Sequence, residues 1–76
     1  MTYDKDKVDD MVLALMHLGF DEKSGRAWKG FDWDAMDRLH DKRFISNPKG
    51  KGKSVALTEE GQQRAAALFR KYFCEQ

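Results

Sequence analysis

The stretch that most constrains the fold is residues 32–61, which reads DWDAMDRLHDKRFISNPKGKGKSVALTEEG. Two short runs suited to strands, 44–46 and 54–58, stand on either side of a loop in which lysine alternates with glycine. Such runs joined by a glycine-containing loop predict a β-hairpin. Segments with helical spacing precede and follow the pair. We therefore expect a hairpin held at its base between two helices.

Apolar spacing predicts three helices. The first, beginning near residues 4–6, should bury one stripe at i, i+3, i+4, i+7 and i+8, with Leu13 and Leu18 widening the same face: Val8, Met11, Val12, Leu15 and Met16. The second starts after Asp32 as N-cap and should turn a second stripe inward: Trp33, Met36, Leu39 and His40. The third starts after Thr58 as N-cap and repeats the first pattern: Ala65, Leu68, Phe69, Tyr72 and Phe73. Residues 49–53 form the exposed tip of the hairpin between the last two helices.

Residues 20–31 carry no clear period, so their structure is the least constrained part of the chain. For RAWKGF at 26–31 we expect a short edge strand, with one loose helical turn as the alternative. The neighbouring aromatic side chains Trp28, Phe31 and Trp33 have two interpretations. They cap a thin core from outside, which is the commoner role, or they form an exposed patch for a partner or for stacked bases.

The chain has 76 residues, enough for a single domain over 1–76, with residues 1–5 and 75–76 expected to fray. A chain of this size buries only about 60% of the surface that its unfolded form exposes. Its core must therefore be thin, and self-association is a reasonable expectation. We expect an α+β domain with the order helix, short strand, helix, two-stranded hairpin, helix.

The positive charge is concentrated on the hairpin, although the net charge is only +1. Residues 1–37 hold nine acidic and five basic side chains, whereas residues 38–53 hold six basic side chains and one acidic side chain. The protein is therefore not a nucleic-acid binder that is strongly basic throughout, but its charge distribution is compatible with a local phosphate-binding surface.

Several classes of site are not expected. Cys74 is the single cysteine and favours a reducing, cytoplasmic setting. His17, His40 and Cys74 lack the spacing of metal ligands, and no run approaches the roughly 20 apolar residues of a membrane span. A phosphate loop at Gly52–Ser54 would need glycine where Asn47 stands. We predict no enzyme, no cofactor, no metal and no small-molecule site.

Along DRLHDKRFIS and KGKGKSVALTEEG the sequence resembles the winged-helix superfamily, in which a basic hairpin, the wing, lies between two helices. The resemblance covers about the second half of the chain. It rests on the following residues: Leu39, Phe44, Ile45, Lys49, Lys51, Lys53, Leu57, Thr58, Glu59, Glu60 and Gly61. The whole chain, RAWKGFDWD included, is also similar to a group of short bacterial proteins without an assigned function.

The winged-helix resemblance implies binding to double-stranded DNA, with the helix before the wing in the major groove and the wing on the backbone. It would make the protein a small DNA-associated transcriptional regulator. Phosphate contacts would then come from six cations: Arg38, Lys42, Arg43, Lys49, Lys51 and Lys53. Two departures weaken groove insertion. The usual second helix is shortened or absent, and the candidate recognition helix carries Asp34, Asp37 and Asp41.

Two alternatives stay open for the function. In the first, the lysine loop is only a solvated hairpin tip; in the second, the domain is a protein-interaction module that keeps the fold without binding DNA. The aromatic candidates for partner contact are Trp28, Trp33, Phe69, Tyr72 and Phe73. The last three, with Met11 or Leu15, would form the seam of a homodimer between first and last helices, unless these helices simply pack on each other within one monomer.

Overall fold

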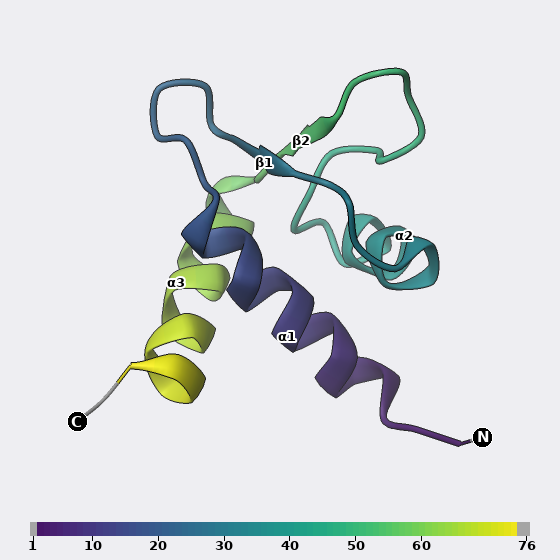
Figure 1. Ribbon diagram of the computed structural model, residues 1–76, viewed down its shortest axis with the longest axis vertical. Helices are drawn as coiled ribbons and strands as arrows, with labels where there is room; N and C mark the ends of the chain where they lie inside the picture. The colour runs from purple at the N-terminus through teal and green to yellow at the C-terminus, as the bar shows by residue number, and fades with distance from the viewer. Residues whose placement is uncertain (1, 75–76) are drawn as a thin grey trace.

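The computed structural model describes residues 2–74 and contains three helices and a two-stranded antiparallel sheet (Figure 1). The elements are α1 (Lys5–Leu18), β1 (Arg26–Trp28), α2 (Trp33–Asp41), β2 (Ser54–Ala56) and α3 (Glu59–Phe73). The predicted α+β class and element order are confirmed, and residues 26–28 are a strand rather than a helical turn. The fraying predicted for residues 1, 75 and 76 lies outside the described residues.

Each helix begins at a side chain that caps it. Asp4, Asp32 and Thr58 accept hydrogen bonds from the backbone N–H groups three residues ahead, at N···O distances of 3.1, 3.0 and 2.9 Å. A cap of this kind satisfies an N–H that has no partner inside the helix and contributes about 1 kcal/mol. The predicted caps Asp32 and Thr58 are therefore confirmed.

The strand β2 is paired on both of its edges. On one edge it runs antiparallel to β1, with Ala27 opposite Val55. On the other edge Ile45 forms a single antiparallel bridge with Leu57, and the Ser46 N–H donates to the Ala56 carbonyl at 2.9 Å. The predicted pairing of the two hairpin runs is thus present, although the first run is too short to count as a strand.

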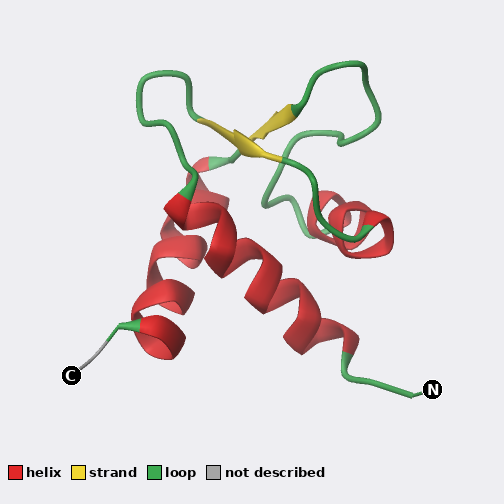
Figure 2. Ribbon diagram, in the orientation of Figure 1, coloured by secondary structure: helices red, strands yellow, loops and turns green. Residues whose placement is uncertain are grey.

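The sheet lies at the C-terminal end of α1 and the N-terminal end of α3 (Figure 2). Helix α1 runs diagonally between α3 and α2 and contacts both, and it also contacts β1. Loops 19–25 and 47–53 project from the sheet end, and the second of these lies on the same side of the molecule as α2 (Figure 1). We call residues 47–53 the wing loop.

The core combines all five elements. Its largest fully buried side chains are Leu13, Met16, Met36, Leu39, Ile45 and Val55. Val55 and Leu57 point inward as predicted. Gly61, at the start of α3, is also buried, and a side chain there would collide with the carbonyl of Phe44. This close approach requires glycine at position 61.

The predicted inner face of α1 is confirmed for Val12, Leu13 and Met16 and is wrong for Leu15 and Leu18, which are exposed. The buried side chains of the helix are Asp9, Val12, Leu13, Ala14 and Met16, whereas Leu15 is 41% exposed and Val8 and Met11 are half-buried. Residues 9, 12, 13 and 16 also follow helical spacing. Asp9 can lie on this inward stripe because ion-pair partners neutralise its carboxylate there.

Candidate nucleic-acid interface

The base of the wing loop is fixed by buried and bonded groups. Pro48 is fully buried, and the Lys29 ammonium donates to the carbonyls of Pro48 and Gly50 at 2.7 and 2.9 Å. The Asn47 side chain accepts from the Lys49 N–H at 2.9 Å. The loop is therefore attached to the segment after β1, and only its tip projects.

The three lysines of the wing loop, Lys49, Lys51 and Lys53, are exposed. Among the described residues none of them forms an ion pair. Their settings differ, however. Lys49 shares a surface hollow with the carboxylates of Asp37 and Asp41, while Lys53 shares another with aromatic side chains. Lys51 and Lys53 are accordingly the wing cations with the least local competition.

Arg38 and Lys42, which the sequence suggested as phosphate ligands, have structural roles. Arg38 donates through Nε and Nη2 to both carboxylate oxygens of Asp9 at 2.8–3.0 Å. The Lys42 ammonium lies 2.9 Å from Asp9 and 3.1 Å from Asp6. The Asp9 side chain is 0% exposed, so the two cations neutralise a buried charge and join α2 to α1. We call Asp9, Arg38 and Lys42 the ionic clamp.

The clamp shifts the acidity of its members. Burial alone would raise the pKa of Asp9, but hydrogen bonds from Arg38 and Lys42 outweigh it and lower that pKa below the ordinary 3.8. Burial tends to lower the pKa of Lys42, yet the hydrogen bonds to Asp9 and Asp6 raise it above 10.5. Asp9 and Lys42 therefore both stay charged around neutral pH. Since Asp9 binds Arg38 and Lys42, neither of these cations is free for a phosphate.

Arg43 lies at the end of α2 in a left-handed conformation, with φ of 67°. The Arg43 N–H bonds to His40 and the Phe44 N–H to Leu39, the pattern of a Schellman helix end, in which glycine is usual. The Arg43 side chain lines a hollow with Glu59 and Glu60. Two nearby carboxylates make it a poorer phosphate ligand than the wing lysines.

The tryptophans are on the surface. Trp28 is 58% and Trp33 67% exposed, while Phe31 packs against the core. The core-capping interpretation is therefore confirmed for Phe31 and wrong for the two indoles. In α2 the fully buried Ala35 takes the inward position that was predicted for Trp33.

The exposed side of α2 is acidic. Asp34 and Asp41 are exposed, and Asp37 is half-buried. With Arg38 and Lys42 engaged by the ionic clamp, these carboxylates dominate the helix surface. Carboxylates are repelled by phosphates, so this helix is poorly suited to a DNA groove.

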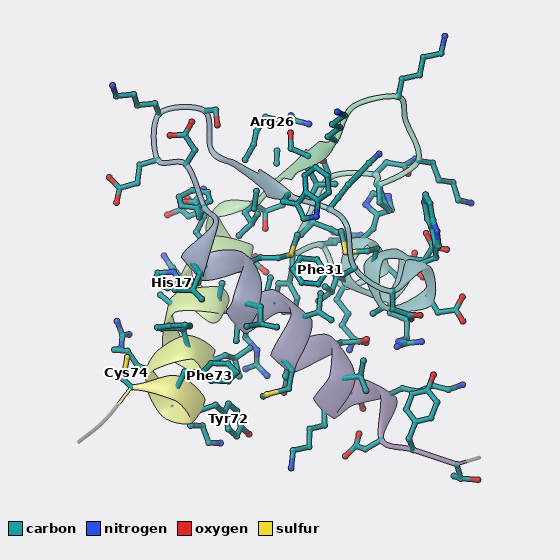
Figure 3. The ribbon with its side chains drawn as sticks, viewed as in Figure 1. His17, Arg26, Phe31, Tyr72, Phe73 and Cys74 are labelled. Carbon is teal, nitrogen blue, oxygen red and sulfur yellow. The ribbon has the colours of Figure 1, made fainter. Side chains whose placement is uncertain are left out.

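Helices α1 and α3 pack on each other within one molecule. Phe69 contacts the ring of His17 at 5.3 Å and that of Phe73 at 5.5 Å between centroids. Tyr72 and Phe73 lie near the C-terminal end of α3, far from the strands (Figure 3), and are 41% and 45% exposed. The predicted seam residues are thus divided between internal packing and surface.

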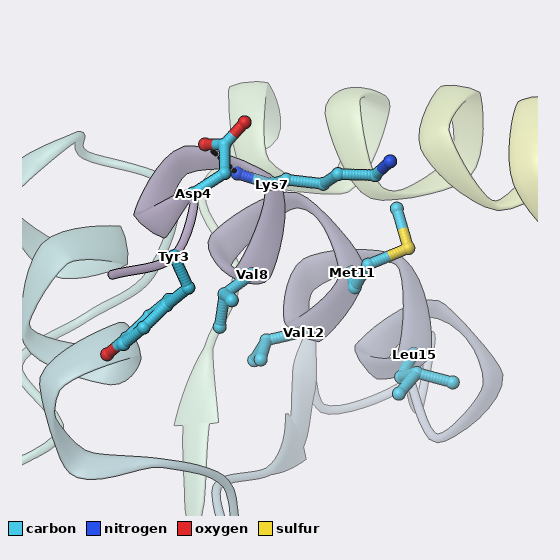
Figure 4. A pocket seen from close by; sticks show the side chains of 7 residues that line it. All are labelled: Tyr3, Asp4, Lys7, Val8, Met11, Val12 and Leu15. Atoms are coloured by element: carbon cyan, nitrogen blue, oxygen red, sulfur yellow. Dashed lines mark hydrogen bonds between the residues drawn. The ribbon is translucent and has the colours of Figure 1, made fainter. Parts of the chain in front are cut away.

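The outer side of α1 carries a shallow apolar hollow of about 420 Å³ (Figure 4). It is lined by Tyr3, Asp4, Lys7, Val8, Met11, Val12 and Leu15. These include most of the stripe that the sequence placed inside, and Figure 4 shows Val8 and Leu15 on the helix and Tyr3 on the segment before it. This is the apolar face that the monomer leaves partly uncovered.

The two candidate reactive side chains, His40 and Cys74, lie in different settings. His40 Nδ1 lies 3.1 Å from the Ile45 carbonyl, a structural contact, and Cys74 is exposed. No cluster of histidine, cysteine or carboxylate groups in residues 2–74 suits a metal ion. None of the described helices is both long and apolar enough to cross a membrane.

Sequence reasoning missed the roles of Asp9, Lys29 and Arg26. Arg26 donates to the Ser54 hydroxyl and carbonyl, both at 2.8 Å, and so braces the start of β2. Asp9 could have been noticed, because it is in phase with Val12 and Met16. Nothing in the sequence marks Lys29, since its carbonyl partners depend on how the wing loop folds back.

Comparison with known proteins finds a matching family model and a relative that aligns over nearly the whole chain. The model of a family described as "Domain of unknown function (DUF6429)" matches residues 4–75. The chain is 49% identical over 73 residues to "Uncharacterized protein y4hR" of Sinorhizobium fredii (strain NBRC 101917 / NGR234), covering 96% of this chain and 97% of the relative. No solved structure matches.

Proposed function

Since the chain belongs to the DUF6429 family, whose description transfers no activity, we propose from its contacts alone that it is a small non-enzymatic module binding nucleic-acid phosphates through the wing loop. The observation that carries the proposal is the wing loop itself. Lys49, Lys51 and Lys53 project on a glycine-spaced tip whose base is held by Pro48 and Lys29. A fixed base lowers the ordering cost of binding, and glycine permits close approach of the backbone.

This proposal keeps the winged-helix resemblance in a reduced form. The wing would contact the backbone, while α2 would stay outside the groove because its surface is acidic. Such contacts position a protein without reading sequence. We expect the protein to act in the cytoplasm as a DNA-associated regulator. Any preference for a DNA sequence would come from contacts other than those of the wing loop.

The test is a titration of labelled duplex DNA by fluorescence anisotropy at several salt concentrations. Three lysines that neutralise one phosphate each give a slope of about −2.7 in log K against log salt. Affinity should then fall roughly fortyfold between 50 and 200 mM salt. Changing Lys49, Lys51 and Lys53 together to Glu should abolish binding.

A matched control separates position from net charge. Lys5, Lys7 and Lys23 are also exposed, and changing them together to Glu gives the same net charge as the wing variant. The control variant should retain most of the affinity. Equal losses in both variants, or no binding of the wild type to either duplex or single-stranded DNA at low salt, would refute the proposal.

The second candidate is a protein-interaction module, favoured by the exposure of Trp28 and Trp33 beside the acidic surface of α2. A complex formed this way should depend on the indoles and change little with salt. Reversal of Asp34, Asp37 and Asp41 to Lys should weaken such a complex, whereas it should strengthen phosphate binding.

Homodimerisation is a separate proposal, based on the apolar hollow of α1 and on the exposed ends of Tyr72 and Phe73. A second copy would cover Leu15, which belongs to the apolar stripe of this hollow and is 41% exposed. Light scattering should show a dimer that Leu15→Glu converts to monomer. A wild type that stays monomeric at high concentration would reject the seam.

A further inference from the structure

A small hollow of about 220 Å³ lies where the end of β1, the start of α2 and the wing loop meet. It is lined by Trp28, Lys29, Gly30, Phe31, Trp33, Gly52 and Lys53. Small-molecule pockets usually measure roughly 300–1,000 Å³ and enclose their ligand. This hollow is smaller and open, so it suits one flat ring system that belongs to a larger ligand.

The indole of Trp28 lies against the turn that follows it in the chain. A side chain at Gly30 would collide with the Trp28 ring at Nε1, so the ring lies directly against the backbone of Gly30. The Phe31 N–H bonds back to the Lys29 carbonyl at 2.8 Å and tightens this turn. The exposed ring is thus a preorganised surface, which reduces the entropy lost on stacking.

The hollow is basic as well as aromatic. Lys53 lines it directly, and no carboxylate does so among the described residues. The nearest acidic side chain in the chain order, Asp32, accepts the Ala35 N–H as the cap of α2. Lys29 is occupied by the carbonyls of Pro48 and Gly50, so it serves to hold the wing loop against the hollow.

We propose that this hollow takes an unpaired nucleobase, and that the preferred ligand is therefore single-stranded nucleic acid. The base would contact both Trp28 and Trp33, while Lys51 and Lys53 contact the flanking phosphates. The inference rests on the proposed function, because it assumes that the wing loop binds phosphate. Aromatic platforms beside a basic groove are a general means of holding single strands without sequence readout. Bases within a duplex are already stacked and cannot reach the indoles.

The acidic surface of α2 supports the same choice. A duplex is stiff, and one that touches the wing loop would bring phosphates of both strands near Asp37 and Asp41, which share a hollow with Lys49. A single strand can follow Lys51 and Lys53 toward the indoles and avoid these carboxylates.

The two tryptophans of the chain both line the hollow, so their fluorescence, excited selectively over that of Tyr3 and Tyr72, reports on this site. We expect an oligothymidylate of about 10 nucleotides, within the usual site sizes, to quench the emission at low salt. It should also bind roughly tenfold more tightly than a duplex of equal length, measured by anisotropy of a labelled strand.

Variants then test each ring by anisotropy. Trp28→Ala and Trp33→Ala should each weaken oligothymidylate binding roughly tenfold and leave duplex binding unchanged, whereas Trp33→Phe should retain most of the affinity. Tyr72→Ala is the matched control, since Tyr72 is similarly exposed but lies on α3. Gly30→Ala changes no aromatic ring but displaces Trp28, and should lower affinity in the same direction. Circular dichroism confirms folding of every variant.

The outcomes distinguish this inference from the proposed function. Binding that needs the wing lysines but neither quenches the tryptophans nor depends on them would overturn the inference and leave the proposed function standing. Absence of both single-strand and duplex binding at low salt would overturn both. Loss of a salt-insensitive protein complex in the tryptophan variants, with oligothymidylate unbound, would assign the hollow to a protein partner instead.

Discussion

Replacing Asp9 with Asn tests how much the ionic clamp contributes to the fold. The substitution keeps size but removes the charge that Arg38 and Lys42 neutralise, and it places an amide N–H₂ before cationic donors. Breaking a buried ion pair from one side costs about 3–5 kcal/mol. The side chains of Arg38 and Lys42 are 24% and 35% exposed, so solvent screening favours the lower end, about 3 kcal/mol.

That loss is large for a chain of 76 residues. Domains of this size have a free energy of unfolding of roughly 4–11 kcal/mol, and each kcal/mol shifts the midpoint by about 4–8 °C. Asp9→Asn should thus lower Tm by roughly 12–24 °C. Urea unfolding followed by circular dichroism gives the free energy, and thermal unfolding gives Tm.

The same variant has a pH signature. Because the pKa of Asp9 is lowered in the folded state, its stabilisation is present above the ordinary value of 3.8 and is lost as pH falls through the folded value. The difference in free energy of unfolding between wild type and Asp9→Asn should therefore become smaller below about pH 4. The raised pKa of Lys42 acts at the other extreme: its contribution is present below 10.5 and disappears as pH rises through the higher folded value.

Asp10 provides the matched control, one residue along the same helix. Its carboxylate lies 3.5 Å from Arg64, and both side chains are partly exposed. A surface pair contributes about 0–1 kcal/mol, so Asp10→Asn should shift stability by less than about 1 kcal/mol. Two results would show that the clamp does not stabilise the fold. One is an equal loss of stability in Asp9→Asn and Asp10→Asn, and the other is a difference between Asp9→Asn and wild type that does not change at acidic pH.

Three other variants test local geometry by urea unfolding. Gly61→Ala should destabilise by about 2 kcal/mol or more although alanine favours helices, because the methyl group meets the Phe44 carbonyl; a stabilised variant would contradict the close approach. Thr58→Ala should lose about 1–2 kcal/mol, since the hydroxyl both accepts the Gly61 N–H at 2.9 Å and donates to the Arg43 carbonyl at 2.7 Å. Arg43→Gly should be neutral or stabilising by about 0.5 kcal/mol, as it relieves a left-handed φ of 67°; a clear loss would show that the arginine side chain has a structural contact.

The parts of the fold that were predictable depend on local chemistry. Turn residues around Lys49–Lys53 indicated the hairpin, and the N-caps Asp32 and Thr58 fixed the starts of two helices within a residue. The orientation of α1 was not predictable from apolar spacing, because two overlapping stripes shared Val12 and Met16. The choice between them depended on Asp9, whose burial makes sense only with cations 29 and 33 residues away.

The candidate site was predictable to a smaller extent. The lysines of the wing loop are exposed as expected. Arg38 and Lys42 look like free cations in the sequence, but both form ion pairs with Asp9, which is distant in the chain. Trp28 and Trp33 illustrate the opposite error, since a large aromatic residue in a thin domain is expected to fill the core. Here Ala35 and Ala27 occupy the inner positions instead, and the indoles are left on the surface.

The ionic clamp also constrains how the family can diverge. The carboxylate of the clamp is buried, and its two cations neutralise it. Replacing one of the three residues alone would therefore leave an uncompensated charge inside the protein. Members that have an apolar side chain at the position of Asp9 should therefore also have lost the positive charges at positions 38 and 42, so that the three sites evolve as one unit.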